Sequence, residues 1–281
     1  MTHRRATVVA VVMVLSLAGC GAKVPPSPPL IRSADDVLIL QMDPLPGYVG
    51  PEASFTHLPI VSVYADGRVI SAAPAPAIAP GPAMPGLQIQ RIPTSDVRRL
   101  VDRARAAGVG NGANLGDPGV TDMGSLRFSL RTDTGLVQTT AYALGEFDDS
   151  TMLSASQRAA RKALENLRDD LTNLGRTLGS VPPPTPYTPD GVAAITEPWR
   201  GSGDESLGSS PPVPWPGPPL PGVYLDQQLG CVVATGVTAT VVIAAAAHAN
   251  ALTVWTYAGK NWTLSFRPLL PDETSCQDLT G

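Results

Sequence analysis

Histidine and cysteine are scarce in this chain, with three of each among 281 residues. A nucleophilic hydrolase needs a base beside its serine or cysteine, and histidine is the usual base. Neither His57 nor His248 accompanies a Gly-x-Ser-x-Gly elbow, so each is expected to be an ordinary surface or packing residue. Histidine at ligand spacing from a cysteine is also missing, as is any Cys-x-x-Cys motif. The sequence therefore predicts no catalytic residue, no metal site and no cofactor.

Basic clusters are missing as well. The chain has 20 Lys and Arg against 24 Asp and Glu, for a formal net charge of −4. Without residues 1–19, which hold Arg4 and Arg5 and no acid, the balance is 18 against 24 and the net charge is −6. Nucleic acids and anionic lipid surfaces attract proteins that carry a basic patch or stripe. We therefore expect no nucleic-acid partner.

A long apolar run is lacking too, which argues against a membrane-spanning helix. The apolar run near the N-terminus covers residues 6–18, or 13 residues, whereas a spanning helix needs about 20. It follows Arg4 and Arg5 and ends in small residues before Cys20, which is the order of a secretory signal. We predict a signal peptide over residues 1–19, so that Cys20 becomes the first residue of the mature chain.

The tetrapeptide Leu17-Ala18-Gly19-Cys20 resembles the lipobox of bacterial lipoproteins, and the chain as a whole resembles uncharacterised secreted lipoproteins of actinobacteria. This resemblance implies that the Cys20 thiol is acylated and that lipid holds the chain on the outer face of the cell membrane. Acyl chains contribute about 0.8 kcal/mol per buried methylene, so two or three of them hold a folded domain there without a spanning helix. The membrane is thus the first expected partner.

Cysteine usage agrees with export. With Cys20 lipidated, Cys231 and Cys276 remain, and an oxidising extracytoplasmic space favours a disulfide between them. The bridge would close a loop of 45 residues and fasten the C-terminal part of the chain. The alternative is a metal-binding or redox-active pair of thiols, which the absence of neighbouring histidines disfavours.

Proline-rich stretches suggest how the chain is divided. Of four such stretches, at residues 24–30, 74–85, 182–189 and 211–221, the last is the one expected to separate two modules. The predicted parts are a lipidated cysteine with a proline-rich tether at 20–35, a main domain at 36–196, a Gly/Ser/Pro-rich linker at 197–221 and a small C-terminal module at 222–281.

Hydrophobic periodicity predicts an α+β fold with a mixed or antiparallel sheet and packed helices. The C-terminal module is expected to be a disulfide-stapled strand, helix and strand, at 230–234, 239–251 and 262–266. In the main domain the expected strands are 37–42, 60–64, 69–70, 87–92, 125–130 and 136–143. The expected helices are 95–107 and a longer one that begins at Ser154 or Ser156 and runs to 178.

Aromatic residues make up only 5% of the chain, yet all four tryptophans fall in its final third. Trp255, Tyr257 and Trp262 bracket a short loop around Gly259 and Lys260, and tryptophan supplies large rigid area at interfaces. These three residues form the candidate binding surface. The alternative is that they pack in the core beneath the disulfide.

The function favoured by these features is a noncatalytic binding or structural role in the cell envelope, with an envelope protein or a wall polymer as partner. One alternative is a wall-directed hydrolase, because glycosidases use two carboxylates without histidine. Another is a solute-binding lipoprotein, although the two similar lobes of many such proteins are not evident. The acids considered for a hydrolase follow strands or lie in loops: Asp117, Asp122, Glu146, Asp148, Asp149, Asp272 and Glu273.

Overall fold

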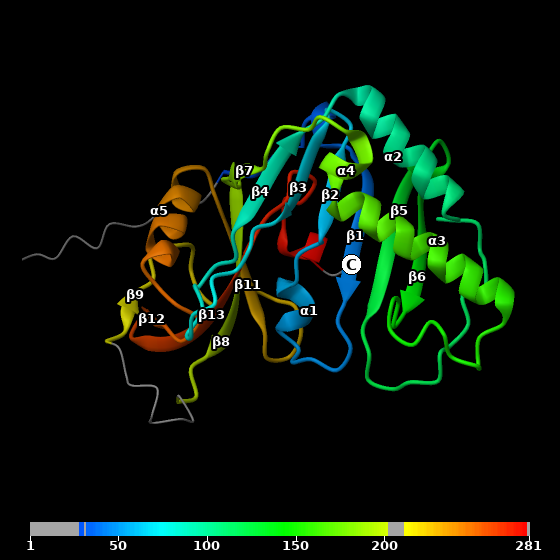
Figure 1. Ribbon diagram of the computed structural model, residues 1–281. Coiled ribbons are helices and arrows are strands. Elements are labelled where there is room, and N and C mark those ends of the chain that lie inside the picture. The colour runs from blue at the N-terminus through cyan, green and yellow to red at the C-terminus, as the bar shows by residue number, and fades with distance from the viewer. Residues whose placement is uncertain (1–27, 31, 202–210, 280–281) are drawn as a thin grey trace, which may run out of the picture.

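The computed structural model describes residues 28–30, 32–201 and 211–279. The chain forms two sheets. Helices α2 and α3 lie on the outer face of the first, and α5 lies on the outer face of the second (Figure 1). Strand pairs in these ranges are antiparallel, apart from the parallel pair of β9 with β12. The predicted α+β class is therefore confirmed. The predicted signal peptide, Cys20 and most of the tether lie outside the described residues.

The first sheet has seven strands in the order β6-β5-β1-β2-β3-β4-β7, and α2 and α3 cover one of its faces (Figure 1). Its strands are β1 (Leu38–Leu45), β2 (Val61–Tyr64), β3 (Arg68–Ala72), β4 (Leu87–Arg91), β5 (Ser125–Thr132), β6 (Gly135–Tyr142) and β7 (Thr185–Tyr187). The helices of this half are η1 (Ala34–Asp36), α1 (Ala53–Thr56), α2 (Thr94–Ala106), α3 (Ala155–Thr172) and α4 (Leu174–Leu178).

In α2 and α3 the apolar residues recur every three or four positions, so they lie on one side of each helix, and this side packs against the first sheet. Val97, Leu100 and Ala104 of α2 are buried at the predicted spacing. A capping box, in which Ser154 and Gln157 each satisfy the other's backbone N–H, begins α3. The long helix that was predicted to run to 178 is in fact two helices, because Asn173 has non-helical backbone angles. The stripe nevertheless continues across the break, since Leu174 and Leu178 stay in the same core.

The second sheet has six strands in the order β10-β11-β8-β13-β12-β9, and α5 covers its outer face (Figure 1). Its elements are β8 (Gly191–Pro198), β9 (Val213–Pro214), β10 (Val223–Tyr224), β11 (Gly230–Thr235), α5 (Gly236–Ala247), β12 (Val254–Tyr257) and β13 (Lys260–Pro268). The predicted order of strand, helix and strand is present. The helix begins at 236 and ends at 247, earlier than predicted at both ends, and β12 is an additional strand.

The change from one sheet to the other falls between β7 and β8, which differs from the predicted division. β8 lies between β11 and β13 at the centre of the second sheet, although residues 36–196 were expected to form one domain. The expected linker at 197–221 contains β9 and the buried Trp215. Proline lacks a backbone N–H and is tolerated at a sheet edge, so this proline-rich segment still pairs there.

A segment after β13 lies between the two sheets and joins them. Leu269 packs with Ile195 and Cys231 of the second sheet, whereas its neighbour Leu270 packs with Tyr64 and other residues of the first. The segment ends in η3 (Cys276–Leu279), and the predicted disulfide connects Cys276 to Cys231 of β11, with their Cα atoms 6.1 Å apart. The layers are thus α2 and α3, the first sheet, the C-terminal segment, the second sheet and α5 (Figure 1).

Candidate functional site

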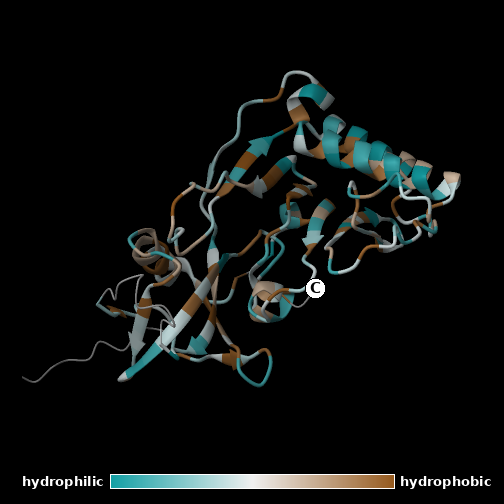
Figure 2. Cartoon of the chain, turned by 60° about the horizontal axis from the view of Figure 1, so that its bottom comes forward, coloured by the Kyte–Doolittle hydropathy of each residue, from teal (hydrophilic) through white to brown (hydrophobic). Residues whose placement is uncertain are grey.

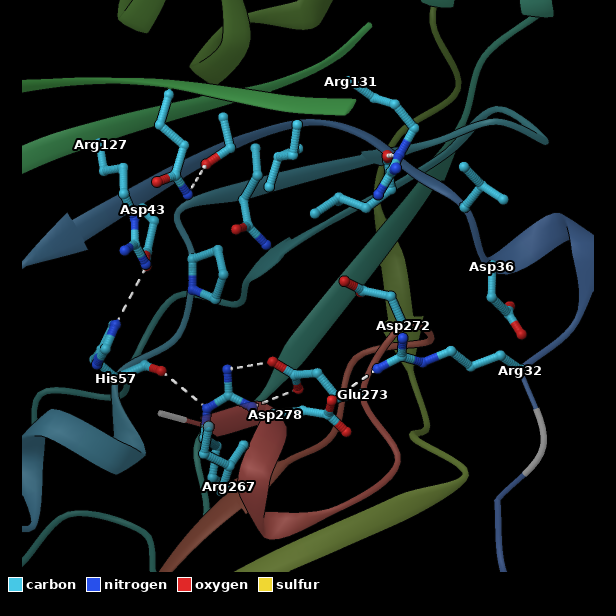
Figure 3. Close-up of a pocket in the computed structure, with 18 of the residues that line it drawn as sticks. Arg32, Asp36, Asp43, His57, Arg127, Arg131, Arg267, Asp272, Glu273 and Asp278 are labelled. Atoms are coloured by element: carbon cyan, nitrogen blue, oxygen red, sulfur yellow. Dashed lines mark hydrogen bonds and ion pairs between the residues drawn. The ribbon is translucent and has the colours of Figure 1, made fainter. Parts of the chain in front are cut away.

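A cleft of about 580 Å³ opens between the first sheet and the C-terminal segment (Figure 3). Its lining is rich in charge of both signs. The acids are Asp36, Asp43, Asp272, Glu273 and Asp278, and the basic residues are Arg32, Arg127, Arg131, Arg267 and His57. A concave site with converging polar groups is the default candidate for ligand binding.

Strand alternation supplies the polar floor of the cleft. On β5, Leu126, Phe128 and Leu130 face the helices, whereas Arg127, Ser129 and Arg131 line the cleft. The pairing of β1 with β2 shifts register between Leu38 and Leu40, as at a β-bulge. After this shift, Leu40 and Met42 face the helix core. Gln41 and Asp43 face the cleft.

Asp43 is the centre of the floor, where it lies between two basic groups. Its Oδ2 accepts a hydrogen bond from Arg127 at 2.7 Å, and its Oδ1 lies 3.4 Å from Nε2 of His57 (Figure 3). The carboxylate of Asp43 raises the pKa of His57 above the ordinary 6.5, in opposition to burial and to the positive charge of Arg267. The three side chains form a charged cluster, called the floor cluster below.

Each member of the floor cluster has one buried polar atom that makes no hydrogen bond of regular geometry in the described part of the chain, although Oδ1 of Asp43 is ion-paired with His57 and the backbone of Ala53 also interacts with the His57 ring. These atoms are Oδ1 of Asp43, Nδ1 of His57 and Nε of Arg127. Buried polar groups are nearly always hydrogen-bonded, and an unsatisfied one costs roughly 1–3 kcal/mol. Because Oδ1 of Asp43 has the ion pair with His57, the open hydrogen-bonding capacity of the floor lies mainly at His57 and Arg127.

Other charges of the cleft already have partners. Arg267 donates two hydrogen bonds to Glu273, at 2.5 and 2.7 Å, and burial raises the pKa of Glu273 although Arg267 opposes it. Asp272 accepts from the Tyr64 hydroxyl at 2.7 Å. Asp278 pairs with Arg32 at 2.8 Å (Figure 3). These contacts fasten the C-terminal segment to the first sheet and to the chain before it.

Arg131 differs from the other arginines of the cleft. Its Nε donates to the carbonyl of Leu38 at 2.8 Å, and its side chain is exposed at the cleft mouth (Figure 3). No carboxylate in the described ranges lies within ion-pair distance of it. A guanidinium with free donors binds carboxylates in a bidentate manner.

The structure brings Asp272 and Glu273 of the predicted acids into the cleft, and leaves the others outside it. Asp117 accepts from the backbone N–H of Gly119, and Asp148 pairs with the buried Arg161. His57 is not assembled as a base, because Nε2 faces Asp43 and Nδ1 is buried. No hydroxyl or thiol of the described residues is hydrogen-bonded to it.

The predicted aromatic binding surface is not exposed. Trp255 and Trp262 are buried, and Tyr257 is partly buried. Trp255 contacts Trp215 and Phe266 edge-on, with ring centroids 5.8 and 5.5 Å apart, and this cluster lies beneath α5. The prediction of a binding surface there was wrong. The alternative of core packing is correct as to burial but not as to place, because the rings lie beneath α5, whereas Cys231 and Cys276 belong to the core on the other face of the sheet. His248 is exposed at the end of α5.

Sequence reasoning missed most of the cleft. The polar positions of β5 were visible as the alternates of Leu126, Phe128 and Leu130, and that pattern is the signal for a shared polar face. A polar face of a strand usually meets solvent, so the pattern alone gave no reason to expect a site. What covers this face comes from residues 267–279, more than 130 positions away in the chain.

His57 should make stability depend on pH. Because its pKa is raised on folding, its pairing with Asp43 stabilises the protein fully below pH 6.5, and this contribution is lost as the pH rises through the folded-state pKa. We expect the difference in free energy of unfolding between the unmodified protein and His57→Gln to be largest in acid and to shrink above pH 6.5. Urea denaturation at a series of pH values measures it.

The matched control is His248→Gln, since His248 has no carboxylate within ion-pair distance in the described ranges. A stability difference for His57→Gln that is the same at every pH would contradict the pairing.

Three further observations bear on the class of the protein. No three His, Cys, Asp or Glu side chains within the described ranges are grouped so that they could hold a metal ion. Among the helices that the structure describes, none combines the length and the apolar character that crossing a membrane requires. Comparison with known proteins gives no matching family model, no matching curated protein and no matching solved structure.

Proposed function

We propose that this chain is an extracytoplasmic lipoprotein, anchored through Cys20, that binds an envelope component without catalysis, and that the polar cleft is its binding site. The observation that carries the proposal is the floor cluster, in which Asp43, His57 and Arg127 lie together in a cleft and the buried Nδ1 of His57 and Nε of Arg127 lack a regular hydrogen bond. A bound ligand or its associated water would satisfy these atoms.

The lining defines the chemistry of the ligand. The guanidinium of Arg131 would bind a carboxylate or another anionic group of a ligand. The acidic side chains would accept hydrogen bonds from its hydroxyl, amide or ammonium groups. Fragments of a wall polymer that carry carboxylates, hydroxyls and amides have all of these groups. We therefore favour a wall polymer over an envelope protein as the partner.

Support for an acidic hydrolase is weaker. A glycosidase needs one carboxyl group free to give a proton and another free to attack or to activate water. In this cleft Asp36, Asp43 and Glu273 each pair with an arginine. Asp272 accepts from Tyr64, and Asp278 accepts backbone N–H groups as well as Arg32. These partners hold the acids in place rather than leave them free to react.

The proposal has two parts, and the experiment tests each. For the anchor, cells that express the chain or its Cys20→Ala variant are fed labelled palmitate and fractionated. We expect label and membrane recovery for the unmodified chain and neither for Cys20→Ala. Membrane recovery of Cys20→Ala equal to that of the unmodified chain would rule out this anchor.

For the cleft, soluble muropeptides are the probe and calorimetry is the measurement. Loss of a hydrogen bond to a charged group costs about 1.5–3 kcal/mol, so Arg131→Gln should weaken binding at least tenfold. Arg98→Gln, an exposed arginine of α2, is the matched control. Muropeptide binding that is equal in the two variants would contradict the assignment of the cleft. Recovery of one dominant crosslinked protein from intact cells would replace the wall polymer by an envelope protein as the partner.

A further inference from the structure

The outer face of α5 is apolar and exposed. Ala239, Val242 and Ala246 of this helix are buried against the second sheet. On the opposite side, Val237 is 81% exposed and Val241 46% exposed, and Ala244 follows them at helical spacing. We call Val237, Val241 and Ala244 the α5 face.

Nothing charged interrupts this region. Residues 227–259 contain no Asp, Glu, Lys or Arg, whereas the exposed sides of α2 and α3 carry many. Figure 2 shows the contrast, because α2 and α3 have long teal stretches and α5 at the opposite end of the molecule is largely brown and pale. A helix that is hydrophobic all round is normally covered on both sides. We therefore expect another surface to cover the α5 face.

The N-terminal segment indicates what that surface is. The hydroxyl of Thr235, the residue before α5, donates to the carbonyl of Pro28. A Cβ atom at Gly236 would lie 3.3 Å from Cγ of Pro28, so the Pro28 ring lies close to Gly236. The first residues that the structure describes are thus fixed at the beginning of α5.

Cys20 is eight residues before Pro28 in the sequence. Eight residues reach at most about 25–29 Å when extended. A helix of 12 residues such as α5 is about 18 Å long. A segment of eight residues that starts at Pro28, beside the beginning of α5, is therefore long enough to extend past the far end of the helix. A short tether also creates a high effective concentration, so that a weak contact between the tethered surfaces becomes populated.

We propose that the α5 face lies on the outer surface of the membrane that holds Cys20, with Val237 and Val241 in the boundary between headgroups and acyl chains. The inference rests on the proposed acylation of Cys20. Charge supports it, because a chain with a net charge of −6 after processing is repelled by anionic lipid except where it presents no acids. The cleft lies on the other side of the second sheet from α5, so this contact turns the cleft toward the wall.

The test uses the acylated protein in vesicles of phosphatidylcholine and phosphatidylglycerol. A fluorescent label sensitive to polarity is attached to Val237→Cys, which has the single free thiol once Cys20 is acylated and Cys231–Cys276 is oxidised. Met152→Cys, 69% exposed before α3, is the matched control. We expect a blue shift and protection from an aqueous quencher at Val237→Cys, and neither at Met152→Cys. Adding Val241→Asp should reverse the protection.

The outcomes separate the two proposals. Intact mass of the same sample reports acylation: if the acyl mass is absent, both the anchor and this inference fall. If the protein is acylated and held on the vesicles while the Val237 label stays in water, the inference alone falls. A blue shift at Val237→Cys in detergent that grows with protein concentration would mean that a second copy covers the face, and would also overturn it.

Discussion

Replacing Trp255 by alanine will lower the free energy of unfolding by about 3–5 kcal/mol, the range found for large aromatic residues in protein cores. Trp255 is 1% exposed and packs edge-on against Trp215 and Phe266. Its removal takes away a large apolar surface and leaves a cavity beneath α5 that the sheet cannot close. Urea denaturation followed by far-UV circular dichroism measures the loss.

Trp199→Ala is the control for this experiment. Trp199 lies just after β8 and is 40% exposed, so its loss should change stability much less. If the two tryptophan variants were equally stable, the aromatic cluster would not be the core of the second sheet. A Trp255 at the surface, which was one of the two interpretations of the sequence, would also give that result.

Breaking the disulfide will have an effect of similar size. Cys231–Cys276 closes a loop of 45 residues, for which the chain-entropy relation gives about 4 kcal/mol at 25 °C. The paired variant Cys231→Ser with Cys276→Ser should lose about this much stability against denaturant. The loss arises because, without the bridge, the unfolded chain has higher conformational entropy, so folding costs more free energy.

Reduction provides an independent measurement. A thiol reductant should destabilise the unmodified protein and leave the paired serine variant unchanged. Cys20→Ala is the matched control for the loss of a cysteine outside the bridge. Equal denaturation midpoints for the oxidised and reduced protein would show that the C-terminal segment is held by its packing and ion pairs alone.

The sequence predicted well those features whose cause is local. The helix at α2 follows from apolar residues three and four apart, and the β5–β6 hairpin follows from strict alternation around a tight turn. The pairing of Cys231 with Cys276 followed by elimination rather than by geometry. The helix and the hairpin could be predicted from residues that are neighbours in the sequence, and the disulfide from the number of cysteines.

The features that the sequence did not predict depend on residues far apart in the chain. Arg161 looks like a solvent-facing residue of α3, yet its guanidinium is buried, where it donates to the carbonyls of Tyr142 and Ala143 and pairs with Asp148. An analysis of hydrophobic periodicity assigns every arginine to the solvent-exposed side of a helix. Only the tertiary structure shows that buried carbonyl acceptors lie next to the Arg161 guanidinium. The cleft was missed for the same reason.

The sheet boundary was misplaced because proline content was interpreted as a sign of a linker. Trp215 is surrounded by prolines in the sequence, but its indole N–H donates to the carbonyl of Pro218 and its ring packs on Phe266. A segment that cannot form regular internal hydrogen bonds can still add an edge strand and a large side chain to a neighbouring core. Composition alone does not distinguish this case from a free linker.

The position of residues 267–279 between the two sheets has a consequence for how the protein comes to be folded. These residues complete the cleft, one face of each sheet and the disulfide, and they are made after every strand they join. Neither sheet has its full set of contacts until this segment has left the ribosome. The order of synthesis therefore postpones the final packing of both sheets until the last residues of the chain are made.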